Sequence, residues 1–313
     1  MTRSNRLFPL MATLLLGISL FSAGCGGETG VSPSESESSV TAPGQTLQTT
    51  SVSTAKPSPT RNQASLSAQE IAMGSLKASQ ELKSIGFDLD FSMSLGLPNM
   101  GTMNMQQTGS AVIDLGGRQM DMAVNMTMDI PNQGKQSGTG EIIAANGWLY
   151  MRTTVTGAAD QWTKMKLTDD LWAAQNRFAG TTAFLTTPTG IVVTGSESIR
   201  GIDCYVLSID PDMASLSNWV AGQTQPGQTG PSTSGADLSK TLESFTVKEW
   251  IAKSTLLPAK SQVSVKLNTG SGSSGAATEM QMNVVVTFTD YGKTVDIKVP
   301  EAALNAKEIV TTK

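Results

Sequence analysis

The sequence predicts an α+β fold in which an antiparallel sheet buries one of its faces and exposes the other. Three observations predict it. An amphipathic helix pattern begins near residue 67, an alternation of apolar and polar residues then recurs along most of the chain, and turn signals such as Gly116-Gly117 and Asn146-Gly147 separate the runs. Strands joined by short turns run antiparallel, and a strand that is polar at every second residue buries only one face.

The first element is expected to be a helix that begins after Ser67. Ser67 and Glu70 have the spacing of a capping box. Leu66 and Ile71 stand where a hydrophobic staple belongs. Gly86 is of the residue type that commonly ends a helix. Between these ends, the apolar stripe consists of Ile71, Leu76, Ala78, Leu82 and Ile85.

After Gly86 the period of the apolar residues changes from near 3.6 to two, which is typical of a half-buried strand. The apolar residues of this first strand are Phe87, Leu89, Phe91, Met93, Leu95 and Leu97. Further strands are expected at 103–115, 119–130, 141–145 and 148–155, and another carries Trp162, Lys164 and Lys166. The clearest alternation is that of Met120, Met122, Val124, Met126, Met128 and Ile130.

The second half of the chain is expected to mix helices and strands. Asp169 or Asp170 can cap a helix that extends through Phe178, and shorter helical segments are expected near 213–220 and 238–245. Strands are expected at 191–193, 201–210, 246–253, 259–267, 280–289 and 294–299. Flexible loops near 222–236 and 268–278 leave a single compact domain across residues 66–313.

The first 24 residues have the anatomy of a lipoprotein signal peptide. Arg3 and Arg6 form a basic start, and a short apolar run follows. Ser22-Ala23-Gly24-Cys25 then resembles the bacterial lipobox, in which the cysteine is acylated, although leucine is commoner at the place of Ser22. About 15 apolar residues are short for a transmembrane helix, which needs roughly 20. We therefore expect Cys25 to be the lipidation site that attaches the chain to a membrane.

Residues 25–65 are expected to be this acylated cysteine followed by a disordered tether. Of the 32 residues from 29 to 60, 15 are Ser or Thr, so the segment buries too little apolar area to offset its ordering entropy. A flexible chain of about 40 residues has a reach of roughly 35 Å. The folded domain is then held near the membrane but is free to stand away from it.

Composition excludes several kinds of chemistry. The chain has no histidine and only two cysteines, Cys25 and Cys204, so histidine-dependent catalysis and His/Cys metal sites cannot form. Charged residues make up 15% of the chain and its formal net charge is −4, which is unsuited to binding nucleic acid. Cys204 is expected to be a small core residue, with a reactive thiol as the alternative. We expect no enzyme activity, no catalytic residue, no metal ion and no cofactor.

Several strings carry a resemblance to a known group of proteins. They are GWLYM at 147–151, QWTK at 161–164, GIDCYVL at 201–207, KEWIAK at 248–253, FTDYG at 288–292 and VDIKVP at 295–300. With the helix-then-strands order, they resemble the LolA-like fold of bacterial lipoproteins, in particular the anchored mycobacterial lipoproteins of the LppX/LprG type. The resemblance implies a strongly curved sheet, an incomplete β-barrel, that wraps around helices and holds acyl chains in between. None of the strings is catalytic, so they indicate a scaffold.

Methionine is abundant, with 16 residues, and many of these fall on the apolar phase of the strands. Because methionine is flexible and polarisable, a face that it lines can repack around lipid tails. The alternatives are ordinary packing beneath the helices and binding of copper(I), for which thioethers are ligands. The residues expected to line a ligand cavity are Phe87, Leu89, Phe91, Met93, Met120, Met122, Val124, Met126, Met128, Met280 and Met282.

Two functions fit these observations. The first is an exported, membrane-anchored lipoprotein, facing outside the cytoplasm, that binds or carries a lipid or another hydrophobic ligand. The second is a structural or protein-interaction lipoprotein of the cell envelope with a filled core and no ligand. In both cases we expect a monomer that contacts the membrane through acylated Cys25. A cavity of several hundred Å³ favours the first function, and a filled interior favours the second.

Overall fold

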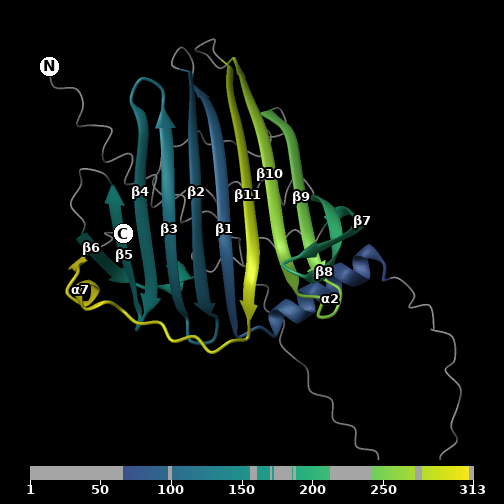
Figure 1. Cartoon of the computed structure of the whole chain (residues 1–313), viewed down its shortest axis with the longest axis horizontal. Helices are drawn as coiled ribbons and strands as arrows, with labels where there is room; N and C mark the ends of the chain where they lie inside the picture. Colours follow the sequence, from purple (N-terminus) through teal and green to yellow (C-terminus); the bar gives the residue numbers. More distant parts are fainter. Residues whose placement is uncertain are drawn as a thin grey trace, which may run out of the picture. The chain divides into compact units, whose positions relative to one another are not determined.

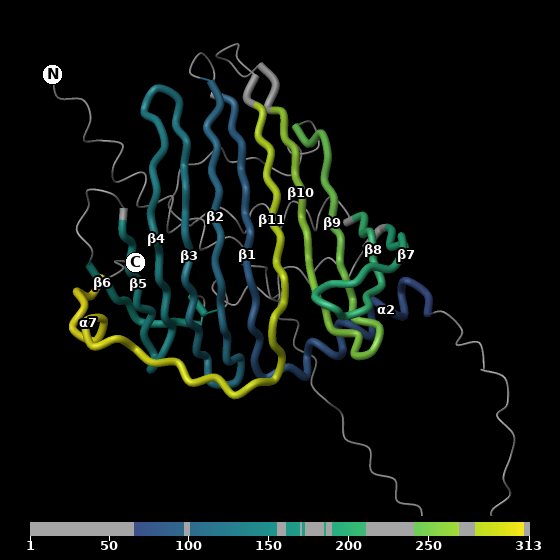
Figure 2. The backbone as a smooth tube through the Cα atoms, viewed as in Figure 1, coloured from purple at the N-terminus to yellow at the C-terminus, as the bar shows by residue number. Residues whose placement is uncertain are grey.

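The computed structural model describes residues 66–97, 101–155, 161–169, 171–172, 185, 188–211, 241–271 and 277–309. The signal peptide and tether expected in residues 1–65, the helix expected at 213–220 and the loop expected at 222–236 lie outside these residues. The helix expected at 169–178 is described only at its start. The described helices and strands belong to one compact unit, and Figures 1 and 2 show that a single sheet makes up most of them.

Helix α2 (Ala68–Gln80) begins as the capping box predicts. Oγ of Ser67 accepts the backbone N–H of Glu70 at 3.3 Å, and the Glu70 carboxylate accepts the backbone N–H of Ser67 at 2.8 Å. The helix ends at Gln80, so the expected end at Gly86 is wrong. The reason is that the chain from Ser84 onward pairs with neighbouring strands, so that Gly86 and the apolar residue before it belong to the sheet.

The sheet contains twelve strands in the described part of the chain. The first six are β1 (Ser84–Leu97), β2 (Gly101–Asp114), β3 (Gln119–Ile130), β4 (Gly134–Ala145), β5 (Trp148–Val155) and β6 (Gln161–Lys166). The next five are β7 (Pro188–Ile199), β8 (Ile202–Pro211), β9 (Leu242–Ala252), β10 (Pro258–Ser271) and β11 (Ala277–Tyr291). A short helix, α7 (Glu301–Leu304), precedes the last strand, β12 (Lys307–Glu308).

Two antiparallel meanders join to make this sheet. The strand order is β12-β6-β5-β4-β3-β2-β1-β11-β10-β9-β8-β7, so β1–β6 form one meander and β7–β11 the other. They meet where β1 pairs with β11, from Ile85 opposite Tyr291 to Leu95 opposite Met280. Because β12 and β7 lie at opposite ends of the order, the sheet is open and not closed (Figure 1). The expected antiparallel sheet is therefore present, and of the helices expected to lie against it the described residues contain chiefly α2.

Both glycine-containing turns behave as expected. Asn146 and Gly147 have φ values of 56° and 77°, the left-handed values that a type I′ hairpin turn requires at both central residues. At the other turn, the side chain of Asp114 accepts the backbone N–H of Gly117 at 2.9 Å. These local turns set the registers of β4 with β5 and of β2 with β3.

Strand pairing overrides two sequence-based expectations in the second meander. Residues 242–245 were expected to be helical but begin β9, because Leu242 lies opposite Leu267 and Phe245 opposite Val265. Residues 268–271 and 277–278 were expected to be loop but extend β10 and β11, which continue to pair.

The segment 292–306 replaces the strand expected at 294–299, which does not form. Both sides of β11 are already paired, with β1 and β10, so the chain that leaves β11 has no free edge beside it. It passes along the ends of the first strands of the sheet toward α7 (Figure 2). Ile297 and Val299 pack there with Tyr150 and Trp162, and this packing replaces sheet pairing.

Candidate ligand-binding face

The two faces of the sheet differ in character. We call the face that α2 covers the apolar face and the opposite one the polar face. Ile71 and Ala72 of α2 pack in one buried cluster with Phe91, Val247 and Val263 of the sheet. Every residue predicted to line a cavity lies on this apolar face. From β10 to β3, the strand registers place the apolar residues of neighbouring strands opposite one another, so that they share one face of the sheet.

Cross-strand pairs bring the predicted residues together. Met93 lies between Met282 of β11 and Met105 of β2, and Met105 lies opposite Met128 of β3. The ring of Phe87 meets that of Phe288 edge-on, with 6.5 Å between their centroids. Contacts between strands far apart in the sequence therefore assemble this methionine-rich patch.

The predicted residues form parts of two buried clusters. Those in the cluster with α2 are Phe91, Met126, Met128 and Met282, with Met93 packed against it. Those in the second cluster are Met120, Met122 and Val124, with Phe87 and Leu89 packed against it. Met280 is half-buried. The exposed fraction of the buried methionines runs from 1% at Met120 to 9% at Met122, so this face is shielded from solvent. That these residues line a cavity stays a prediction.

The apolar face changes composition along the sheet. On β1–β5, which we call the methionine half, its methionines are Met93, Met103, Met105, Met120, Met122, Met126, Met128 and Met151. On β7–β10, which we call the valine half, its buried residues are Ile191, Leu207, Ile209, Val247, Ile251, Val263 and Val265. Helix α2 lies beside β7 at the valine half (Figure 1).

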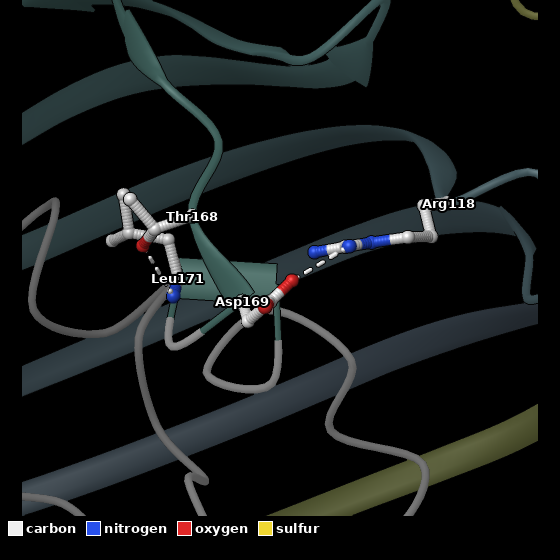
Figure 3. A network of polar contacts seen from close by, with 4 residues as sticks. All are labelled: Arg118, Thr168, Asp169 and Leu171. Atoms are coloured by element: carbon white, nitrogen blue, oxygen red, sulfur yellow. Dashed lines mark hydrogen bonds and ion pairs between the residues drawn. The ribbon is translucent and has the colours of Figure 1, made fainter.

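The segment after β6 is held beside the methionine half. The backbone oxygen of Thr168 accepts the N–H of Trp172 at 2.9 Å, and its Oγ1 accepts the N–H of Leu171 at 3.2 Å. Thr168 therefore caps this helical turn in place of Asp169, and Asp170, the other expected cap, lies outside the described residues. Asp169 instead accepts a hydrogen bond from Arg118 at 2.7 Å (Figure 3). The Arg118 guanidinium lies 5.9 Å from the ring of Trp172, which packs against the second cluster.

One buried carboxyl group lies on the valine half. Glu249 of β9 is 2% exposed, and its side chain accepts a hydrogen bond from Oγ of Ser261 at 2.7 Å. Burial raises the pKa of Glu249 to about 8, although the bond from Ser261 lowers it in part. The group therefore carries its proton at neutral pH. The pKa of Tyr291 is also raised, first by burial and then by repulsion from Glu249 at the high pH at which that carboxyl is ionised. The Tyr291 hydroxyl donates a hydrogen bond to the backbone oxygen of Pro258.

One buried amide lies on the methionine half. Gln107 of β2 is 3% exposed, and its Oε1 accepts no hydrogen bond from the described residues. Neither Gln107 nor Glu249 was among the site residues predicted from the sequence. The signal that marks them is a polar residue on the apolar phase of a strand: Gln107 follows Met105 at a spacing of two, and Glu249 follows Val247 in the same way.

The polar face carries two shallow hollows. The first, of about 460 Å³, is lined by Asp88, Asp90 and hydroxyl side chains of β2 and β11, and Arg200 pairs with Asp88 at 2.6 Å. The two aspartates are thus charges on the exposed face of a strand. The second, of about 350 Å³, lies beneath residues 294–297. There burial, and then repulsion from Glu141, raise the pKa of Asp121.

Cys204 is a core residue, as expected. It is fully buried in β8, its thiol donates to the backbone oxygen of Ile202 at 3.2 Å, and burial raises its pKa. Asp210 lies within β8, in agreement with the strand expected at 201–210. Within the described ranges, no cluster of three acidic or thiol side chains is placed to hold a metal ion. No helix in those ranges is both long and apolar enough to span a bilayer.

A model of a protein family matches residues 67–308, which is most of the chain and all of the sheet. The chain belongs to DUF6612, a family of unknown function. No curated protein matches the sequence significantly.

Several solved structures are similar to the chain. The lipoprotein LppX of Mycobacterium tuberculosis matches with a TM-score of 0.40 and 11% identity, covering 74% of this chain and 98% of its own. LprF of Mycobacterium bovis matches with a TM-score of 0.41 and 14% identity, covering 74% and 96%. A LolA-superfamily protein of Nitrosomonas europaea matches with a TM-score of 0.20 and 13% identity, covering 75% and 96%. The similarity to this group of proteins is one of fold, at 11–14% sequence identity.

Proposed function

We propose that this member of DUF6612 is an exported, membrane-anchored lipoprotein that binds or carries a lipid or another hydrophobic ligand on the methionine half of its apolar face. The observation that carries the proposal is the gathering of methionines from β1, β2 and β3 on one shielded face of an open sheet. An unbranched thioether side chain changes rotamer at low cost, so such a face can adapt to ligands of different shape.

Apolar burial supplies the affinity in this proposal. Each methylene that leaves water contributes about 0.8 kcal/mol, so ten methylenes contribute roughly 8 kcal/mol. The loss of translational freedom and the ordering of the chain oppose binding by several kcal/mol. We therefore expect good binding only from ligands whose apolar chain has roughly ten carbons or more.

The attachment to the membrane depends on Cys25. Acylation there, followed by the tether to residue 65, places the domain outside the cytoplasm and within reach of the bilayer that donates or receives the ligand. Reversible ligand binding of this kind involves no reaction, and so needs no catalytic residue, metal ion or cofactor. Replacing Cys25 by alanine should move the protein from the membrane fraction to the soluble fraction.

A structural or protein-interaction role with a filled core is the alternative. It is favoured by the tight burial of Met105, Met120 and Met128, which are 1–3% exposed. Side chains that already pack against one another leave less room for a ligand. Ligand uptake separates the two functions.

Native mass spectrometry of the chain from residue 25 onward, carrying Cys25→Ala, tests the proposal. This chain has no acyl group of its own, so an amphiphile that co-purifies from the host is a ligand. We expect such an adduct, and uptake of a fluorescent fatty acid. Met126→Gln on the apolar face should reduce uptake, whereas Asn125→Gln on the polar face should leave it unchanged. Absence of any adduct, together with no uptake, contradicts ligand binding and supports the structural role.

A further inference from the structure

Gln107 is a polar residue in apolar surroundings. It lies between Phe91 of β1 and Met126 of β3, both buried. The nearest residues of β2 on the same face are Met105 and Gly109. The amide is thus surrounded, in the plane of the sheet, by four residues that offer it no polar side chain.

The oxygen of this amide, Oε1 of Gln107, is buried and has no donor among the residues that the structure describes. Such an acceptor destabilises a folded protein, and a methionine or leucine would fill the same place without that cost. Glu249, the buried carboxyl on the valine half, differs because Ser261 donates to it. The polar group of the valine half thus has a hydrogen-bond donor, whereas Oε1 in the methionine half has none among the described residues.

We infer that Gln107 is the polar anchor of the ligand site, and this inference rests on the proposed function. Oε1 accepts a hydrogen bond from the hydroxyl, amide N–H or protonated carboxyl group of a bound amphiphile. The apolar chain of the ligand then lies along the neighbouring methionines, such as Met105 and Met126. The ligand class is thereby narrowed to long-chain amphiphiles that carry a hydrogen-bond donor.

A site built to hydrogen-bond a donor discriminates against an analogue that lacks one, because the buried acceptor is again left unpaired. Two probes of equal chain length make this comparison. 1-Dodecanol carries an O–H donor, and its methyl ether carries none. Their affinities are measured by displacement of the fluorescent probe 1-N-phenylnaphthylamine from the chain that begins at residue 25 and carries Cys25→Ala.

The decisive variant is Gln107→Met, which keeps the side-chain length and removes the amide. The unsubstituted protein should bind dodecanol about tenfold more tightly than the ether, which is the discrimination expected of one hydrogen bond. In Gln107→Met the affinity for dodecanol should fall about tenfold, to that for the ether, and the affinity for the ether should stay unchanged. Because the variant loses an unpaired buried acceptor, its melting temperature without ligand should not fall.

Gln106→Met is the matched control. Gln106 precedes Gln107 in the same strand but is exposed on the polar face, so the same substitution there should leave the preference for dodecanol intact. If Gln107→Met does not fold, Gln107→Asn, which shortens the side chain by one methylene, should still weaken dodecanol selectively.

The outcomes separate the two hypotheses. If both probes bind and Gln107→Met leaves the preference for dodecanol unchanged, the role of Gln107 is refuted while ligand binding stands. If the unsubstituted protein binds the two probes equally, the role of Gln107 is likewise refuted while ligand binding stands. If neither probe binds, both the anchor and the proposed function are refuted.

Discussion

The two halves of the apolar face are packed with different kinds of side chain. The valine half consists mainly of branched side chains, such as Val247, Ile251 and Val263, each at most 2% exposed, and α2 covers it. Branched side chains have few rotamers and specify one packing arrangement. The methionine half is also largely buried, but many of its side chains are unbranched, adaptable methionines that pack beside branched residues such as Val124. One half therefore consists of stiff side chains, and the other contains many side chains that change rotamer easily.

The buried polar groups follow the same division. Glu249 of the valine half is hydrogen-bonded by Ser261, whereas Oε1 of Gln107 in the methionine half has no donor among the described residues. A satisfied polar group needs no ligand, and an unsatisfied one is expected to find a partner. The comparison therefore predicts that substitutions in the valine half change stability and those in the methionine half change binding.

The largest effect is expected from Glu249. Its pKa of about 8 in the folded protein lies above the ordinary value of 4.5 for a glutamate side chain, so the folded state binds this proton more tightly than the unfolded chain does. Protonated Glu249 therefore contributes up to about 5 kcal/mol to the free energy of unfolding. This contribution is complete below pH 4.5, declines as the pH rises toward 8 and is lost above pH 8. Glu249→Gln should flatten this dependence in urea unfolding between pH 5 and pH 9. The exposed Glu301→Gln is the control, and a decline that persists in Glu249→Gln contradicts the assignment.

A truncation in the valine half should come next. Ile251 is fully buried beneath α2, and Ile251→Ala should lower the free energy of unfolding by about 2 to 5 kcal/mol, because it leaves a cavity that the branched neighbours cannot fill. Ligand affinity, measured well below the melting temperature, should stay within about twofold. Loss of binding in a variant that is still folded shows that the valine half also contacts the ligand.

Substitutions in the methionine half should reverse this pattern. Met122→Leu and Met126→Leu conserve volume and should each cost less than about 1.5 kcal/mol of stability. Because leucine is stiffer than methionine, the double variant should bind a narrower range of chain lengths in a series of fatty alcohols from eight to sixteen carbons. The same range for the double variant and the unsubstituted protein indicates that these methionines serve as ordinary core.

The smallest effect is expected at the cap of α2. Ser67→Ala removes the hydroxyl that accepts the N–H of Glu70 and should lower stability by about 1 kcal/mol. Ser67→Thr keeps an accepting hydroxyl and should recover most of the loss. Thermal unfolding measures the change, and uptake of dodecanol should be the same in all three proteins. A cap variant that alters uptake indicates that α2 takes part in the ligand site.

Local sequence signals predicted the elements that depend on local physics. The capping box at Ser67, the turn at Asn146-Gly147 and the alternation from Met120 to Met128 each act within a few residues, so they could be recognised without the fold. The predictions that failed depend on distant partners. Residues 242–245 are strand because β10 lies beside them, and residues 294–299 are not strand because β1 and β10 already occupy both sides of β11.

The sequence by itself determined that this chain has an antiparallel sheet with one apolar face rich in methionine, because strand alternation and residue type are properties of each segment. Only the tertiary structure decided that β1 and β11 join two meanders into one open sheet, since that pairing spans nearly two hundred residues of chain. The same pairing places Met93 beside Met282 and separates the methionine half from the valine half. Only the tertiary structure shows that Oε1 of Gln107 has no donor among the described residues, because the spacing along β2 indicates that this side chain is buried but not which groups surround it.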